Sequence, residues 1–204
     1  MDSLTKLSNR KKLSSSYEDG PVLYNEFAVK LATYNRSIII NEPISKDTSN
    51  AVSALLLYYD HQNHDPITMY INTDGGDVDS LITMYSFMKM IKSPVKTVCL
   101  SRAYSAGAVL LCAGTKGMRY VLDNSKVMIH NIVFAIGLPE ISVYTDSDQY
   151  HKHLEKCNNV LMKIISNQTG KNIEKVKQDC SKDFYMTAKE AIAYGMADDI
   201  WRGQ

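Results

Sequence analysis

The sequence predicts an α/β fold in which strands and helices alternate along one domain. Three short runs rich in β-branched or apolar residues are predicted to be strands: 38–40, 67–72 and 95–100. The segments between them place apolar residues at helical spacing, which predicts amphipathic helices. Such alternation favours a parallel sheet connected by right-handed crossovers. A chain of 204 residues, 45% of them hydrophobic, is long enough for one domain of this kind.

The first two helices each follow residues that favour a helix start. The first helix is predicted to begin within residues 45–49, which include several N-cap residues. Its apolar row consists of Val52, Leu55, Leu56 and Tyr59. The second helix is predicted to follow the turn at 74–77 and to end before Pro94. Its apolar positions are Leu81, Ile82, Tyr85, Met88 and Ile91.

The alternation continues in the second half of the chain. The third strand leads into a turn at Ser105 and an apolar helix that Gly114 ends. Two more short strands are predicted over 119–122 and 126–130, with turn residues between them. The capping-box pattern at 187–190 predicts a short final helix.

Three segments depart from simple alternation. Residues 1–20 are polar and are expected to form a flexible arm, which leaves 21–204 as a single domain. Residues 132–143 are apolar but contain the break Gly137-Leu138-Pro139, which predicts either an irregular hairpin or a projecting element. A long helix is predicted over 145–168.

Composition argues against several classes of protein. The net charge is +1 with both signs interspersed, which disfavours nucleic-acid binding. No run has the length of a membrane span, and the first residues lack the apolar core of a secretory signal. The cysteines are widely spaced and match no metal motif, so no metal or cofactor is expected. These features favour a cytoplasmic protein with reduced thiols.

Ser105 is the first candidate for chemistry. It stands between the third strand and an apolar helix, flanked by residues too small to cover it. A serine at such a turn lies at the positive end of a helix dipole, where a developing oxyanion is stabilised. Serine is also a common helix N-cap, so the position alone fits both a nucleophile and a cap.

A serine nucleophile needs a general base and a group that orients the base. His130 follows an apolar strand, at the end of the sheet where functional side chains gather. Asp183 precedes an aromatic pair and can orient an imidazole. A buried core histidine and an ordinary loop acid remain open as alternatives. The turn Gly75-Gly76 can supply oxyanion donors together with Ala106, or be only a turn between strand and helix.

Taken in order along the chain, these pieces resemble the Clp protease proteolytic subunit (ClpP, peptidase family S14), as a divergent member. The resemblance covers most of the chain after the N-terminal arm. The segments that carry it are Ile71-Asn72-Thr73-Asp74-Gly75-Gly76, Ser105-Ala106-Gly107-Ala108-Val109-Leu110-Leu111, Ala113-Gly114-Thr115-Lys116-Gly117-Met118-Arg119-Tyr120, Asn124-Ser125-Lys126-Val127-Met128-Ile129-His130, Thr169-Gly170, Asp183-Phe184-Tyr185-Met186-Thr187-Ala188-Lys189-Glu190-Ala191 and Tyr194-Gly195-Met196-Ala197-Asp198.

The resemblance implies a serine endopeptidase. It assigns Ser105 as nucleophile, His130 as base and Asp183 as orienting acid. It places the oxyanion donors among Gly75, Gly76 and Ala106. It implies that the substrate backbone is bound by a strand that contains Ile132, Val133 and Phe134.

The resemblance also implies an architecture and partners. The fold would be crotonase-like and superhelical, built of repeated strand–helix units, with a protruding handle over about 131–168. Two heptameric rings would stack as a homo-oligomeric tetradecamer around a chamber. An ATP-driven AAA+ unfoldase would feed unfolded polypeptides into it, and the protease itself would need no metal or nucleotide.

Several residues depart from the family pattern. The segment after His130 differs, Tyr104 replaces a small residue beside the nucleophile, and Asp74 replaces a proline. Tyr70 is kept at the expected unfoldase-docking pocket, whereas Thr68 and Met90 stand where aromatic residues are common. These changes leave open a weakly active or structural subunit that assembles with an active paralogue. A crotonase-type acyl-CoA enzyme and a Ser–Lys peptidase are further alternatives on the same fold.

Overall fold

The computed structural model describes residues 35–132 and 147–203. In this part of the chain, seven strands form one sheet. The strands are β1 (Ser37–Ile40), β2 (Ile67–Thr73), β3 (Val95–Tyr104), β4 (Arg119–Val121), β5 (Lys126–Ile129), β6 (Phe184–Thr187) and β7 (Asp199–Ile200). The helices are α2 (Lys46–Gln62), α3 (Val78–Met90), α4 (Ala106–Ala113), α5 (Ser147–Thr169), α6 (Ile173–Asp179) and α7 (Ala188–Tyr194).

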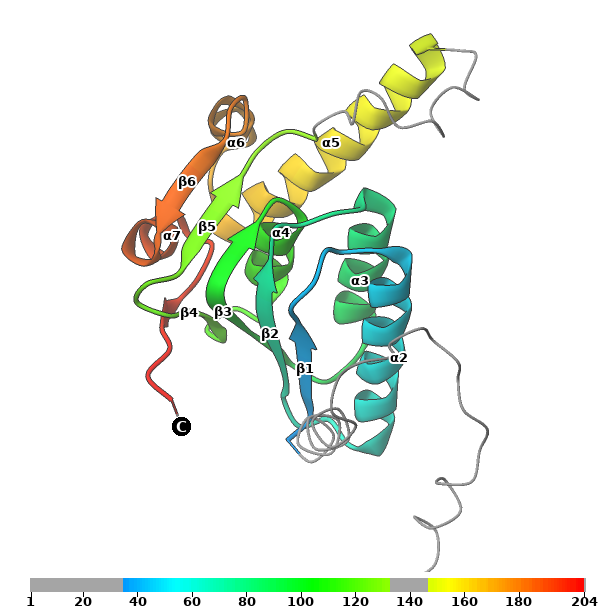
Figure 1. Ribbon diagram of the computed structural model, residues 1–204, viewed down its shortest axis with the longest axis vertical. Coiled ribbons are helices and arrows are strands. Elements are labelled where there is room, and N and C mark those ends of the chain that lie inside the picture. Colours follow the sequence, from blue (N-terminus) through cyan, green and yellow to red (C-terminus); the bar gives the residue numbers. More distant parts are fainter. Residues whose placement is uncertain (1–34, 133–146, 204) are drawn as a thin grey trace, which may run out of the picture.

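The sheet has the parallel core that the sequence predicts (Figure 1). Its order is β1-β2-β3-β4-β7, and each neighbouring pair in this row is parallel. β5 lies parallel to β3 and carries β6 on its other side in antiparallel orientation. The predicted α/β class is therefore confirmed, with one antiparallel strand added at an edge.

The helices begin at the residues that local sequence signals predict. The Ser45 hydroxyl accepts a hydrogen bond from Thr48 N at the start of α2, and the Asp77 carboxylate accepts one from Ser80 N at the start of α3. The capping box between Thr187 and Glu190 is formed at the start of α7. These bonds are local, so a short stretch of sequence is enough to predict them.

β3 is longer than predicted, and besides β2 it pairs with two further strands, β4 and β5. It continues to Tyr104 instead of ending at Leu100. Its first half pairs with β4, and its last residues pair with β5, where Arg102 lies beside Lys126. The polar residues Ser101 and Arg102 interrupt the apolar pattern, but pairing on the sheet keeps them extended. This extension carries the chain directly to Ser105.

Three short elements were not predicted from the sequence: α6, β6 and β7. Each has at most seven residues, which is too short to show a clear period. β6 forms because its backbone pairs with β5, and β7 because it pairs with β4. The contacts that stabilise these strands come from distant parts of the chain.

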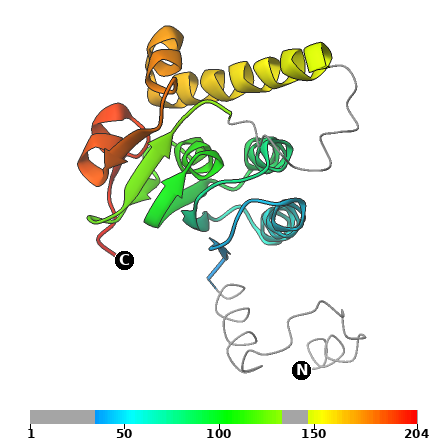
Figure 2. The same ribbon diagram turned by 45° about the horizontal axis from the view of Figure 1, so that its top comes forward.

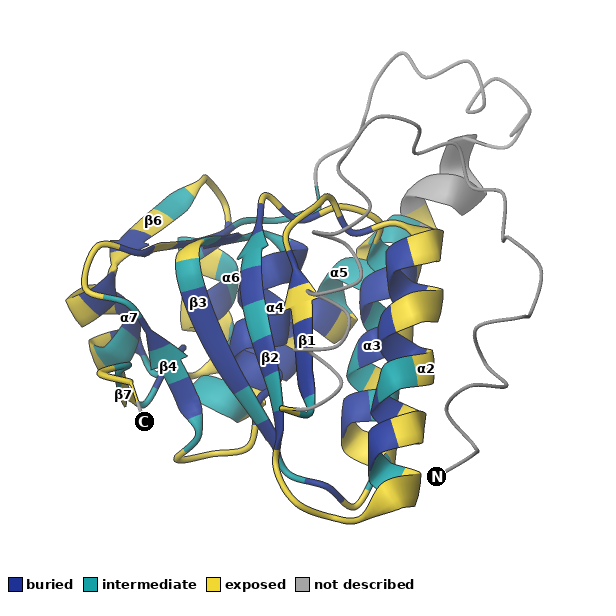
Figure 3. Cartoon of the chain, turned by 60° about the horizontal axis from the view of Figure 1, so that its bottom comes forward, coloured by how far each residue is buried: buried dark blue, intermediate teal, exposed yellow. Residues whose placement is uncertain are grey.

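The core lies between the sheet and the helices α2, α3 and α4. β2 alternates strictly, with Ile67, Met69 and Ile71 fully buried on the face towards the core. α2 and α3 bury one face each and expose the other (Figure 3). All residues of α4 are buried, because it lies between the sheet and α5 (Figure 2). The start of α4 is therefore held rigidly.

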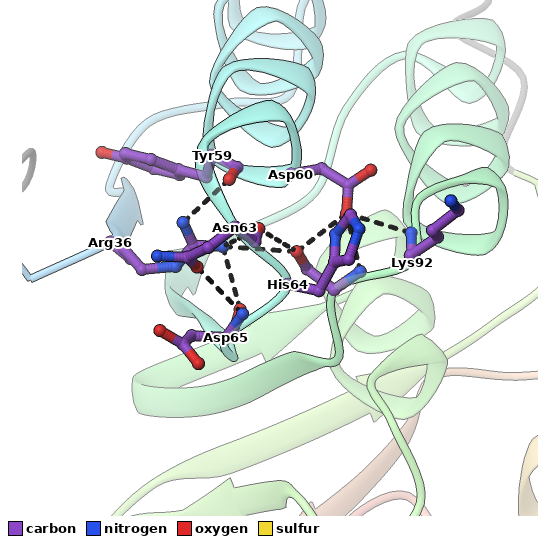
Figure 4. A network of polar contacts seen from close by, with 8 residues as sticks. Arg36, Tyr59, Asp60, Asn63, His64, Asp65 and Lys92 are labelled. Atoms are coloured by element: carbon purple, nitrogen blue, oxygen red, sulfur yellow. Dashed lines mark hydrogen bonds and ion pairs between the residues drawn. The ribbon is translucent and has the colours of Figure 1, made fainter.

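At the amino ends of the strands, Asp60 collects hydrogen bonds from two other segments (Figure 4). Its Oδ1 accepts from the backbone N–H groups of Lys92 and Ser93 at 3.1 and 2.7 Å and from the Ser93 hydroxyl at 2.8 Å. His64 Nδ1 lies 3.2 Å from the same oxygen. Burial acts to raise the pKa of Asp60, but the hydrogen bonds from Ser93 and His64 hold this pKa below its usual value.

Arg36 completes this network from the start of β1. Its guanidinium donates to the backbone oxygens of Tyr59, Asn63 and Asp65, at 2.8 to 3.3 Å, and to the Ser93 hydroxyl at 3.2 Å. The group also lies over the Tyr59 ring, with 5.5 Å to its centroid. The end of α2, the start of β1 and the turn before β3 are thereby joined.

Candidate active site

Ser105 occupies the turn between β3 and α4 in a strained conformation. Its φ of 52° and ψ of −119° are rare for a residue with a side chain. It stands at the N-cap position of α4, yet its side chain makes no capping hydrogen bond. The hydroxyl instead lies 2.8 Å from His130 Nε2. The geometry therefore does not support the simple cap interpretation.

Strand register brings His130 to Ser105. β3 and β5 are parallel, with Tyr104 beside Met128, and Ser105 N donates to Met128 O at 2.8 Å. His130 follows the last residue of β5 and so extends past the same end of the sheet. Parallel pairing places the residues that follow two neighbouring strands side by side.

The antiparallel strand β6 brings Asp183 to His130. Ile129 of β5 pairs with Phe184 of β6, so the residue after β5 lies opposite the residue before β6. His130 Nδ1 is 3.0 Å from Asp183 Oδ1. Ser105, His130 and Asp183 thus form a continuous chain of contacts in which the imidazole is in the middle.

The imidazole is sheltered, whereas the carboxylate is open. The exposed fraction of the side chain is 17% for His130 and 54% for Asp183. With a proton on Nδ1, the ring donates to Asp183 and presents the Nε2 lone pair to the Ser105 hydroxyl. This tautomer can accept the hydroxyl proton.

The turn at Gly75-Gly76 lies against Ser105. A Cβ on Gly75 would come within 2.8 Å of Ser105 Cβ, and one on Gly76 within 2.1 Å of Ile44 O. Their φ values of 102° and 150° also favour glycine. Glycine is therefore required at both positions, because a side chain would collide with Ser105 at position 75 and with the backbone of Ile44 at position 76.

Three backbone N–H groups near Ser105, those of Gly75, Gly76 and Ala106, differ in whether they already have a hydrogen-bond acceptor. Gly75 N donates to Thr73 Oγ1 at 3.1 Å, so this donor is already used. Within the described part of the chain, the N–H groups of Gly76 and Ala106 have no hydrogen-bond acceptor. Gly76 and Ala106 both line a cavity with Ser105. They are the donors available to a bound oxyanion.

A cavity of about 220 Å³ opens beside Ser105 and His130. Its polar edge includes Asp74, Gly76 and Ala106. The rest of its lining is apolar and comes from α3, α4, the end of β5, the segment that follows β5, and α5: Val78, Leu81, Val109, Ile129, Ile132, Leu161, Met162 and Ile165. Such a cavity suits an apolar side chain placed next to the reacting serine.

The predicted substrate strand is described only in part. Ile132 lines the cavity, whereas Val133 and Phe134 lie outside the described residues. Ile132 N donates to Asn158 Oδ1 at 3.1 Å, and Asn158 Nδ2 donates to Asn131 Oδ1 at 3.0 Å. Asn158 of α5 thus holds the two residues that follow His130. Sequence reasoning missed it, because one amide on a polar helix face carries no signal.

Tyr104 lies away from the cavity. Its ring packs edge to face against Tyr185 of β6, with 5.6 Å between the centroids. Tyr104 is not among the described residues that line the cavity. The substitution of a small residue by Tyr104 therefore leaves the approach to Ser105 open.

The described residues offer no competing nucleophile or base beside Ser105. Burial raises the pKa of Cys99, Cys112 and Cys180 to about 12, so these thiols stay protonated near neutral pH. Burial lowers the pKa of Lys89, but this ammonium donates to Ala113 O at the far end of α4. No lysine stands among the described residues that line the cavity.

No group of three or more histidine, cysteine or acidic residues is arranged to hold a metal ion in the described part of the chain. None of the described helices has both the length and the apolar character that crossing a membrane requires.

A model of the Clp protease family matches residues 24–204. The chain belongs to the Clp protease family. The family consists of serine peptidases that generally work as oligomers with ATPase partners. The resemblance expected from the ordered motifs is thereby confirmed, and the chain is a ClpP-type peptidase.

Proposed function

We propose that the chain is a serine endopeptidase that cleaves unfolded polypeptides through Ser105, His130 and Asp183. The observation that carries this proposal is the 2.8 Å contact between His130 Nε2 and the strained Ser105 hydroxyl, with Asp183 on the other ring nitrogen. The order of contacts is the one that acyl transfer by a serine requires.

The proposed reaction has two halves. His130 Nε2 takes the proton of the Ser105 hydroxyl as the oxygen attacks the peptide carbonyl, and Asp183 stabilises the imidazolium that forms. His130 then gives the proton to the leaving amine, which departs from the acyl-enzyme. In the second half, His130 takes a proton from a water molecule as the water attacks the ester. The bond between the acyl carbon and the Ser105 oxygen then breaks, and His130 returns the proton to that oxygen.

The oxyanion is proposed to bind the N–H groups of Gly76 and Ala106. Both line the cavity, and neither donates to another described residue. The dipole of α4 also points its positive end towards this place. Gly75 serves in a different way, because the absence of a Cβ lets the turn approach Ser105.

The apolar cavity supports a substrate preference. A peptide whose residue before the scissile bond is leucine or methionine can place that side chain against Val109, Leu161 and Ile165. Aspartate at the same position would lose hydration without gaining a partner on the apolar wall of the cavity. Ile132, Val133 and Phe134 are proposed to bind the backbone of the peptide.

The assembly and its partners follow from the family. We propose a single domain over 21–204, preceded by an arm over 1–20, with residues 131–168 as the handle of a superhelical ClpP-type fold. Stacked heptameric rings would enclose the active sites, and an ATP-hydrolysing unfoldase would supply the polypeptides. Native mass, measured on the same sample as peptidase activity, tests the ring assembly.

Labelling by a fluorophosphonate probe tests the nucleophile. The probe is expected to modify the assembled full-length protein at Ser105, as located by mass spectrometry, and to leave Ser105→Ala unmodified. A folded Ser93→Ala variant is the matched control and should be labelled like the wild type. If the assembled protein stays unlabelled and hydrolyses no peptide, the proposal fails and a structural subunit that needs an active paralogue becomes the better description.

A further inference from the structure

An ion pair lies at the turn that carries Gly76, one of the two proposed oxyanion donors. Arg102 Nη2 donates a hydrogen bond to Asp74 Oδ2 at 3.0 Å, and Arg102 Nε lies 2.6 Å from Asp74 Oδ1. The second contact is an ion pair that lacks the alignment of a hydrogen bond. Each carboxylate oxygen of Asp74 thus faces a nitrogen of one guanidinium.

Asp74 brings a negative charge to the place where another would develop. It lines the same cavity as Ser105, Gly76 and Ala106. It also directly precedes Gly75, whose backbone touches Ser105. An oxyanion bound beside Gly76 would be repelled by an unpaired carboxylate on this turn. The site therefore contains a group that opposes the proposed reaction unless its charge is balanced.

Arg102 is well placed to balance that charge. It belongs to β3, three positions before Ser105, and its backbone pairs with β5. The strand fixes the start of the side chain, and the guanidinium reaches the turn from the same end of the sheet. Arginine remains charged at any pH at which a peptidase works.

The pair contributes little to the stability of the fold. The exposed fraction is 43% for the Arg102 side chain and 65% for Asp74, and ion pairs this open to solvent are weak. The backbone of the turn has its own anchors, since Ile44 N donates to Gly75 O and Asp77 N donates to Ile44 O, each at 2.8 Å. A role in the reaction explains the arrangement better than a role in folding.

We infer that Arg102 is a positioning residue that neutralises Asp74 and so keeps the oxyanion site favourable for negative charge. This inference rests on the proposed peptidase function. It makes an asymmetric prediction, because Arg102 is needed only while Asp74 carries its charge. If the ion pair only stabilised the turn, replacing Asp74 would lower kcat as much as replacing Arg102.

Kinetics of four variants, measured as full-length assembled protein on a fluorogenic peptide, test the asymmetry. Arg102→Gln should lower kcat by about tenfold, with KM and Tm little changed, because an unpaired carboxylate then faces the oxyanion. Asp74→Asn should keep kcat at or above the wild-type value. The double variant should behave like Asp74→Asn, and Arg102→Lys should regain most of the lost rate because it restores the charge.

Lys126→Gln is the matched control. Lys126 is exposed and lies beside Arg102 on β5, so the change removes the same charge without touching Asp74. Its kcat should equal that of the wild type.

Three outcomes would overturn the inference. They are an unchanged kcat in Arg102→Gln, a double variant as slow as Arg102→Gln, and a loss in Asp74→Asn equal to that in Arg102→Gln. Failure of the peptidase proposal has a different signature, since the wild type itself would then be inactive and Ser105 unlabelled.

Discussion

The described part of the chain contains two clusters built from serine, histidine and aspartate, one at each end of the sheet. At the carboxyl ends of the strands, His130 stands between Ser105 and Asp183, at 2.8 and 3.0 Å. At the amino ends, Asp60 stands between Ser93 and His64, at 2.8 and 3.2 Å. The same residue types are therefore joined in a different order.

The order decides what each cluster can do. In the first, the serine hydroxyl faces a nitrogen that can take its proton, and a cavity lies beside it. In the second, the Ser93 hydroxyl donates to a carboxylate and receives a bond from Arg36, and the serine is buried. A carboxylate at the centre gathers donors and ties segments together, whereas an imidazole at the centre can move a proton. Residue composition alone does not place a serine hydroxyl beside a group that can take its proton.

The largest difference in peptide hydrolysis is expected between the variants of Ser105 and Ser93. Ser105→Ala is expected to reduce peptide hydrolysis on the order of a million-fold, since it removes the proposed nucleophile. Ser93→Ala should retain the wild-type kcat but lower the free energy of unfolding, because the part-buried hydrogen bond to Asp60 is lost. Steady-state kinetics and urea unfolding of both variants measure the two effects. A fully active Ser105→Ala protein would refute the comparison.

The second largest difference in kcat is expected between the variants of Asp183 and Asp60. Asp183→Asn is expected to lower kcat about ten-thousandfold, because an amide can stabilise the wrong tautomer of His130 and cannot balance an imidazolium. Asp60→Asn should leave kcat unchanged and lower Tm, because the amide is a weaker acceptor for Ser93 and His64. Activity is best expressed per mole of folded, assembled protein, so that unfolded protein is not counted. Equal losses of kcat in both variants would mean that the two clusters do not differ as described.

The stability that Asp60 provides should depend on pH in a defined direction. The hydrogen bonds of the folded state hold the pKa of Asp60 below the unfolded value of 3.8. A depressed carboxyl pKa stabilises the folded state above the unfolded pKa, and this stability is lost as the pH falls through the folded pKa. The Tm difference between wild type and Asp60→Asn should therefore be constant near neutral pH and shrink below about pH 4. A difference that grows on acidification would contradict this assignment.

Replacement of His64 should have the smallest effect on stability and activity. Its side chain is 55% exposed, and its contact with Asp60 is an open one. His64→Gln is expected to change the unfolding free energy by less than about 0.5 kcal/mol and to leave kcat unchanged. His130→Gln is the paired variant, and it should lose hydrolysis as completely as Ser105→Ala. Comparable activities for the two histidine variants would remove the distinction between the clusters.

Much of the candidate site is predictable from sequence because its members lie at element boundaries. Ser105 follows a strand, His130 follows another, and the Gly75-Gly76 turn follows a third. Parallel strands bring such boundaries to one edge of the sheet, so the residues could be nominated before their contacts were known. The family pattern then selected Asp183 from many acids.

Arg102 and Asn158 could not be predicted in the same way. Arg102 stands in the part of β3 where the apolar pattern fails, and Asn158 lies on a polar stretch of α5. Their roles depend on which loop each side chain reaches, at Asp74 and at 131–132. That distance is set by packing and not by spacing along the chain.

The sequence by itself determined the α/β class, the first helix start within residues 45–49, the later helix starts after the turn at 74–77 and at Thr187, and the types of residue available for chemistry. These depend on interactions within a few residues, which a local pattern encodes. The tertiary structure alone decided which serine meets a histidine. β6 brings Asp183 beside His130 across 53 positions, and the turn before β3 carries Ser93 to Asp60 instead. Strand pairing at long range makes that choice, because it fixes which side chains share one end of the sheet.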